Sequence, residues 1–90
     1  MNNVNEEISM RLYEGLKSKY NSEIQMAKAT MMIYFNNPVA IGEHPQHLEE
    51  MDKLLESIAT AEDKLSALTK CFSNYSMDKI QETRHGRASP

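Results

Sequence analysis

The segment MDKLLESIATAEDKLSALTKCFSNY, residues 51–75, decides the fold of this 90-residue chain. Its apolar residues recur at alternating steps of three and four, the spacing that keeps one side of an α-helix against a partner helix over its whole length. This apolar stripe consists of Met51, Leu54, Ile58, Ala61, Leu65, Leu68, Phe72 and Tyr75. The segment therefore predicts a long helix that packs lengthwise on another helix.

The first 35 residues predict the partner helix. An upstream row of apolar residues steps by four and drifts around the helix, because one turn holds 3.6 residues. This row comprises Val4, Ile8, Leu12, Leu16 and Tyr20, and a row with heptad spacing follows it: Ile24, Ala27, Met31 and Tyr34, with Met10, Tyr13 and Met32 to the side. We expect the heptad row to pack on the second helix and the drifting row to meet a further neighbour.

Prolines mark the turn between the two predicted helices. Asn36, Asn37 and Pro38 end the first helix, because Asn tolerates the left-handed conformation found after helices and Pro cannot donate another helical hydrogen bond. The second helix begins near Pro45, whose missing N–H is harmless in a first turn, with His44 as the N-cap.

The predicted domain organisation is a helical hairpin of residues 1–82, with helices over about 4–35 and 45–75, followed by a disordered tail of residues 83–90. Two long helices joined by a short connection run antiparallel. A lone hairpin buries few large side chains relative to the entropy lost when its backbone is ordered. The fold class that we predict is all-α, an antiparallel helical hairpin that assembles into a four-helix bundle or a larger homo-oligomer, most simply a dimer.

Composition narrows the functions that we expect. The formal net charge is −3, which disfavours nucleic acid and anionic membranes as partners. No apolar run approaches the ~20 residues that span a bilayer, and the first residues lack the basic and apolar regions of a signal peptide. The one cysteine, Cys71, cannot form an internal disulfide, and a lone cysteine is typical of a reducing compartment. We therefore expect a cytoplasmic protein.

Polar groups gather at the start of the second predicted helix. His44, His47 and Glu50 supply imidazole and carboxylate groups, which are plausible ligands for a transition metal. Their order is the reverse of the Glu-x-x-His pairs in helical di-metal bundles. We therefore interpret His44 as a helix cap and His47 as a solvent-facing residue of the first turn, and a metal-binding helical bundle stays an alternative.

Motifs for other chemistry do not occur in the sequence. It contains neither a glycine-rich phosphate loop nor a nucleophile motif, and no histidine lies near Cys71 in the sequence to activate its thiol. We predict no catalytic, cofactor-binding or metal-binding residue, no cofactor, and no enzymatic activity. A further alternative is an oligomer that sequesters a small molecule, such as a nucleotide signal, in clefts between protomers lined by Arg11, Lys17 and Lys19.

The turn between the helices carries a resemblance to a group of known proteins. Residues 34–45 read YFNNPVAIGEHP, followed by EEMDKLL at 49–55 and AEDKL at 61–65. This stretch resembles small helical-hairpin accessory proteins of large tailed bacteriophages, in which an N-P-V-x-I-G-E-H-P turn joins two helices. The resemblance extends over roughly residues 24–70 and implies a phage accessory protein that acts in the cytoplasm of the infected bacterium. It transfers no active site.

Together these features predict a non-enzymatic helical interaction protein. We expect it to associate with itself and to bind and modulate or inhibit a host macromolecule, whose identity the sequence does not give. The acidic second helix is the surface that we expect it to present.

Overall fold

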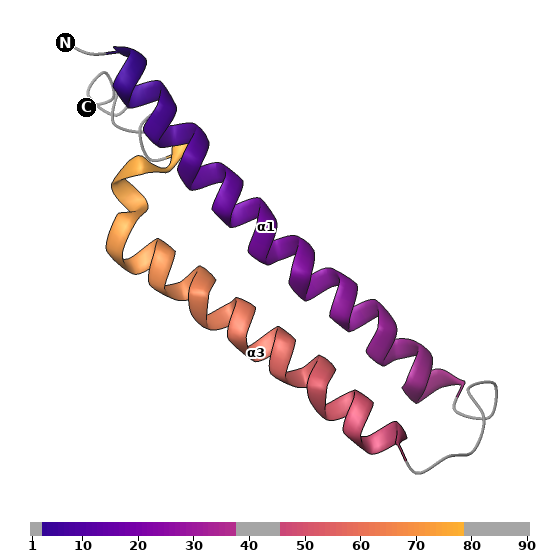
Figure 1. Cartoon of the computed structure of the whole chain (residues 1–90). Helices are drawn as coiled ribbons and strands as arrows, with labels where there is room; N and C mark the ends of the chain where they lie inside the picture. Colours follow the sequence, from indigo (N-terminus) through magenta and orange to yellow (C-terminus); the bar gives the residue numbers. More distant parts are fainter. Residues whose placement is uncertain (1–2, 38–45, 79–90) are drawn as a thin grey trace, which may run out of the picture.

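The computed structural model describes residues 3–37 and 46–78. Helix α1 spans Asn3–Asn36, helix α3 spans His47–Phe72, and a short 3₁₀ helix, η1, spans Ser73–Tyr75. The two long helices lie side by side and run in opposite directions, so that α1 begins at the end of the hairpin where α3 finishes (Figure 1). The predicted all-α antiparallel hairpin is confirmed.

The hairpin is elongated. Its radius of gyration is 19.0 Å, whereas a compact domain of this length has a radius of gyration of about 12 Å. Two helices alone present a large surface relative to their shared interior. No helix in the described ranges is both long enough and apolar enough to cross a membrane.

The end of α1 matches the prediction, and the start of α3 corrects it. Asn36 is the last helical residue, and the Asn37 N–H donates to the carbonyl of Ile33 at 2.9 Å. Helix α3 begins at His47 with Gln46 in the N-cap position, and the Gln46 side chain makes no capping hydrogen bond. The prediction that His44 is the N-cap is therefore wrong, and His44 itself lies outside the described residues.

Acidic side chains explain why α3 begins without a side-chain cap. Glu49 and Glu50 lie in its first turn, where negative charge is favourable next to the positive end of the helix dipole. The Glu50 N–H also donates to the carbonyl of Gln46 at 2.9 Å.

The seam between the helices follows the predicted heptad stripes over most of its length. Residues of the α3 stripe that are buried or half-buried are Met51, Leu54, Ile58, Ala61, Leu65 and Leu68. Their counterparts on α1 are Tyr20, Ile24, Ala27, Met31 and Tyr34. Ala61 is the most deeply placed of the buried apolar residues, at 1% exposure.

Two ring contacts fix the antiparallel register. The rings of Tyr34 and His47 meet edge to face, with centroids 5.7 Å apart and an interplanar angle of 74°. Further along, the Lys64 ammonium lies 5.7 Å from the centroid of the Tyr20 ring, a distance at which the ring attracts a cation. This register places Ala61 at the level between Tyr20 and Ile24.

The first half of α1 departs from the predicted pattern. Tyr13 is only 5% exposed, whereas Leu12 is 66% exposed, although Tyr13 was expected to lie to the side of the apolar row. The heptad register continues from Tyr20 through the half-buried Lys17 to Tyr13 and Met10. Helix α1 therefore keeps one straight seam, and the row that steps by four turns away from it into solvent.

The end of α3 also departs from the pattern. Phe72 belongs to the predicted stripe and is 51% exposed, and Tyr75 is exposed as well. Phe72 is the last residue of α3, and its backbone is no longer helical, at φ −132° and ψ 20°. The helix thus ends before either ring can be covered by α1.

A hydrogen bond between distant residues holds the end of the described chain against α1. The backbone is helical again at Met77 and Asp78, and the Met77 N–H donates to the Glu14 carboxylate at 3.0 Å. A carboxylate at the start of a helical turn is favoured by the unpaired N–H groups there.

We predict that enlarging Ala61 destabilises the hairpin. Ala61→Leu inserts extra methylene groups into a closely packed seam, which costs about 1–3 kcal/mol of unfolding free energy. Ala59→Leu, at an exposed position of the same helix, changes the unfolding free energy by less than about 0.5 kcal/mol. Urea unfolding at one protein concentration measures both, and equal midpoints would show that the seam is not tightly packed.

We also predict that Glu14 protects the Met77 amide. Glu14→Ala removes the acceptor and accelerates hydrogen exchange at Met77, with a loss of roughly 0.5–1.5 kcal/mol of unfolding free energy. Glu14→Gln keeps a side-chain oxygen at the same place and retains most of the protection. If the Met77 amide exchanges at the same rate in Glu14→Ala as in the wild type, the hydrogen bond does not anchor this segment.

Candidate interaction surface

An apolar groove lies where the first half of α1 faces the end of α3 and η1. It has a volume of about 300 Å³. The residues that line this apolar groove are Ser9, Leu12, Tyr13, Leu16, Leu68, Phe72 and Tyr75. Tyr13 and Leu68 are buried and form its floor, while the other apolar side chains are exposed and form its walls.

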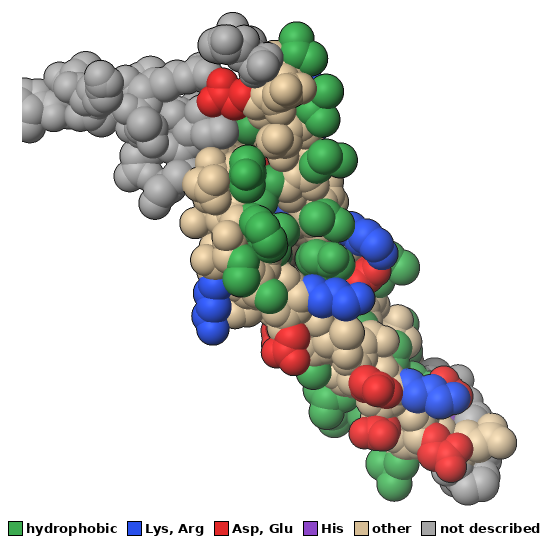
Figure 2. All heavy atoms as spheres, turned by 60° about the vertical axis from the view of Figure 1, so that its left-hand side comes forward, with side chains coloured by type: hydrophobic (Ala, Val, Ile, Leu, Met, Phe, Trp, Pro, Cys, Tyr) green, Lys and Arg blue, Asp and Glu red, His purple; other side chains and the backbone are tan. Residues whose placement is uncertain are grey.

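An exposed row of aliphatic side chains extends the groove along α1. This apolar ridge consists of Val4, Ile8, Leu12 and Leu16, all of them exposed. Figure 2 shows apolar side chains gathered in the upper part of the view, toward the start of α1, whereas acidic and basic side chains predominate toward the loop end. Contiguous exposed apolar surface of this kind is typical of interaction sites.

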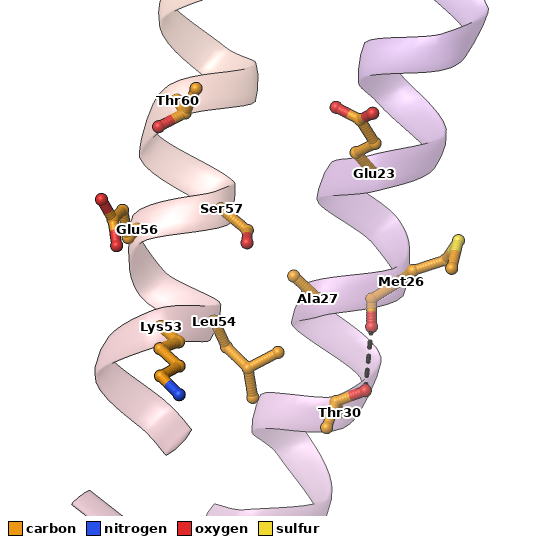
Figure 3. Close-up of a pocket in the computed structure, with 9 residues that line it drawn as sticks. All are labelled: Glu23, Met26, Ala27, Thr30, Lys53, Leu54, Glu56, Ser57 and Thr60. Atoms are coloured by element: carbon orange, nitrogen blue, oxygen red, sulfur yellow. Dashed lines mark hydrogen bonds between the residues drawn. The ribbon is translucent and has the colours of Figure 1, made fainter. Parts of the chain in front are cut away.

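A second, larger groove lies nearer the loop. This loop-end groove has a volume of about 650 Å³ and is lined by Glu23, Met26, Ala27, Thr30, Lys53, Leu54, Glu56, Ser57 and Thr60. Figure 3 shows Leu54 directed across the gap toward α1, with the Thr30 hydroxyl turned back on its own helix. That hydroxyl donates to the Met26 carbonyl at 3.2 Å. The loop-end groove therefore combines the apolar side chains of Met26 and Leu54 with small, polar and charged groups, whereas no charged residue lines the apolar groove.

Both grooves open on the same side of the hairpin. Ser9 and Leu16 line the apolar groove, while Glu23 and Thr30 line the loop-end groove, and these four follow one another at intervals of seven. Residues seven apart lie on the same side of a packed helix. The hairpin thus has one grooved side with an uncharged apolar end and a mixed end that carries charged groups.

Charged side chains separate the two grooves. The Lys19 ammonium donates to the Glu23 carboxylate at 2.6 Å. This hydrogen bond, together with the charge of Glu23, raises the pKa of Lys19, and the same hydrogen bond lowers the pKa of Glu23. Lys64 adds a third charge from α3 and also favours the ionised Glu23. All three are accessible to solvent, so they form a hydrated boundary.

The residues of the alternative metal site, His44, His47 and Glu50, are only partly within the described chain. His47 is half-buried with its ring against Tyr34, so the prediction that it faces solvent is wrong. Glu50 lies 3.9 Å from the Lys53 ammonium. His44 lies outside the described residues, and within the described ranges no three His, Cys, Asp or Glu side chains are grouped to hold a metal ion.

The basic residues proposed for a nucleotide cleft are dispersed. The Arg11 guanidinium pairs with Glu7 at 2.9 Å, Lys19 pairs with Glu23, and Lys17 lies half-buried in the seam. None of the three lines either groove. Cys71 is exposed on α3.

The helical spacing of the sequence predicted the apolar ridge but did not predict the apolar groove. Stepping by four predicted an apolar row that turns away from the seam, and the row is exposed from Val4 to Leu16, while its last member, Tyr20, is half-buried in the seam. The groove also needs Tyr13 as its floor and Phe72 as its wall, and both positions were misassigned. Continuing the heptad register upstream from Tyr20 would have placed Tyr13 correctly.

Comparison with known proteins adds no relative. No protein-family model, curated protein or solved structure matches this chain. The turn motif that carries the resemblance to phage accessory proteins spans residues 37–45, of which 38–45 lie outside the described residues, and the resemblance stays a prediction.

Proposed function

We propose that this chain is a non-enzymatic helical interaction protein that associates with itself through the apolar groove and ridge and acts by binding another macromolecule. The observation that carries the proposal is the exposure of this contiguous apolar surface, which no charged residue lines, at one end of the hairpin. Leu12 and Phe72, from different helices, are both more than half exposed and line one groove.

The small interior of the hairpin supports self-association. Among the described residues, the buried apolar side chains are Tyr13, Ile24, Ala27, Ala61 and Leu68. Two of these are alanines, which bury little surface. Small scaffolds with so few large buried side chains gain stability by oligomerisation or by other added restraints. A second copy of the chain is always available as a partner, because it is present wherever the protein is made.

The exposed apolar area is sufficient for such a contact. The ridge together with Phe72 and Tyr75 exposes on the order of 500 Å² of side-chain surface per copy. If the contact covers all of this surface, two copies bury about 1,000 Å², which is at the low end of the range for specific protein interfaces.

The chemistry of the ridge favours a copy of itself. Its four residues are uncharged, so an isologous two-fold contact juxtaposes apolar side chains without bringing like charges together. The simplest assembly is a homodimer of two hairpins, that is, four helices.

The second part of the proposal concerns the macromolecule that the protein binds. The resemblance to phage accessory proteins favours a protein of the bacterial host, met in the cytoplasm. Acidic residues of α3 are exposed along its length: Glu49, Glu50, Asp52, Glu56, Glu62 and Asp63. A surface of this charge favours a partner with a basic face.

We predict that Leu12→Asp prevents dimer formation. A charge buried in an apolar contact has no partner there and is strongly unfavourable, so sedimentation equilibrium at micromolar concentration should change from dimer to monomer. The matched control is Leu55→Asp, at a 54% exposed leucine of α3 that lines neither groove, and it should sediment as the wild type does. A wild-type chain that sediments as a stable monomer would defeat the self-association proposal.

We predict that binding of the host protein depends on the acidic face. Immobilised wild-type protein should capture a bacterial protein in a manner that weakens with salt, because screening acts on exposed charges. The double variant Glu62→Lys/Asp63→Lys should lose the captured protein, while Asn21→Lys, which adds positive charge to α1, should keep it. Capture that is insensitive to the double variant would exclude α3 as the presented surface.

A further inference from the structure

The seam and the ridge have different periodicities, and this difference sets how a second hairpin can pack. The seam alternates steps of three and four, which suits nearly parallel helix axes, inclined by about 20°. The ridge steps by four at every position, from Val4 to Leu16. Two ridges that step by four interdigitate when their helices cross at about 50°. The seam is already occupied within the hairpin, and the ridge is the exposed apolar row that continues into the apolar groove, so the ridge is the contact that we assign to a second copy.

From this geometry we infer that the two copies cross at their apolar ends and diverge toward their loops, in place of the aligned four-helix bundle expected from the sequence. The inference rests on the self-association proposed above, and it specifies the geometry of that contact. The contact centres on Leu12 and Leu16, because these two residues belong to both the ridge and the apolar groove.

The charge distribution on the grooved side favours the same arrangement. An aligned bundle would cover the Lys19–Glu23 pair and Lys64, and then the loop-end groove with Glu56 and Lys53 on its walls. Removing such charges from water is costly unless each gains a well-oriented partner. A crossed contact restricted to the apolar ends leaves all of them hydrated.

The occupant is a second copy because the area and the symmetry both fit. The contact spans about four turns of α1 and the rings at the end of α3, which matches the small interface estimated above. Helices that cross at this angle separate quickly away from the crossing point, so the contact cannot extend along the whole hairpin. The loop-end groove of each copy then stays open in the dimer.

Distances between nitroxide labels on the two copies test the inference. The native Cys71 is exposed near the apolar groove, and Leu48, at 78% exposure, supplies a site near the loop as Leu48→Cys in a Cys71→Ser background. These positions lie about 35 Å apart along α3. In a crossed dimer, the Leu48 pair should be farther apart than the Cys71 pair by more than about 15 Å. In an aligned bundle of either polarity the two distances should be similar, and that result would overturn the inference.

A matched pair of substitutions gives a second readout. Leu12 and Ile33 lie 21 residues apart on the same side of α1, and both are exposed. A crossed dimer predicts that Leu12→Asp raises the dimer dissociation constant at least a hundredfold, while Ile33→Asp changes it less than threefold. Comparable weakening by both variants would indicate an aligned bundle.

Sedimentation of the same labelled samples distinguishes a failure of the crossed geometry from a failure of self-association. A dimer with equal label distances refutes only the crossed geometry and leaves self-association standing. A monomer, with no distance between copies, refutes self-association and the crossed geometry together.

Discussion

The antiparallel seam between α1 and α3 is the constraint on which the rest of the structure depends. Both helices carry side chains at the same alternating spacing, so they remain in contact from the Tyr34–His47 pair near the loop to Tyr13 and Leu68 at the other end. Because the seam takes up one narrow stripe of each helix, every apolar side chain outside it must find a partner elsewhere or face water. The distribution of exposed apolar side chains follows from which residues lie inside the seam and which lie outside it.

The distribution of the remaining apolar side chains gives the hairpin two distinct ends. Near the start of α1 they form a continuous apolar surface with the end of α3, whereas near the loop the same side mixes Met26 and Leu54 with small, polar and charged groups. Lys19 and Lys64 lie at the boundary of the two ends, next to Glu23 on the wall of the loop-end groove. An interaction protein with this layout can associate with itself at one end while its acidic second helix and loop-end groove remain available to a different partner. In the function proposed above, the start of α1 and the end of α3 serve assembly, and the acidic residues of α3 serve recognition.

The exposed apolar surface also connects stability with function. A hairpin whose interior includes two alanines among its few buried apolar residues gains much from covering Leu12, Phe72 and their neighbours, so folding and association are expected to be coupled. In such systems the oligomer is the folded unit, and its stability depends on protein concentration. The Glu14–Met77 hydrogen bond links the chain beyond η1 to the same end of α1, so the segment closest to the apolar groove is positioned by a polar contact.

The sequence by itself determined the helices, the end of α1 at Asn36 and the stripe that joins them, because these depend on local periodicity and on residues that terminate helices. It also predicted that the row from Val4 to Leu16 would turn away from the partner helix. Only the tertiary structure decided which of two neighbouring side chains, Leu12 or Tyr13, enters the seam, since that choice depends on where the other helix lies. The structure likewise decided that Phe72 forms a groove wall, because α3 ends there before α1 can cover the ring. The spacing of apolar residues predicts which side of a single helix is buried, whereas a groove is formed by two helices and depends on how they pack.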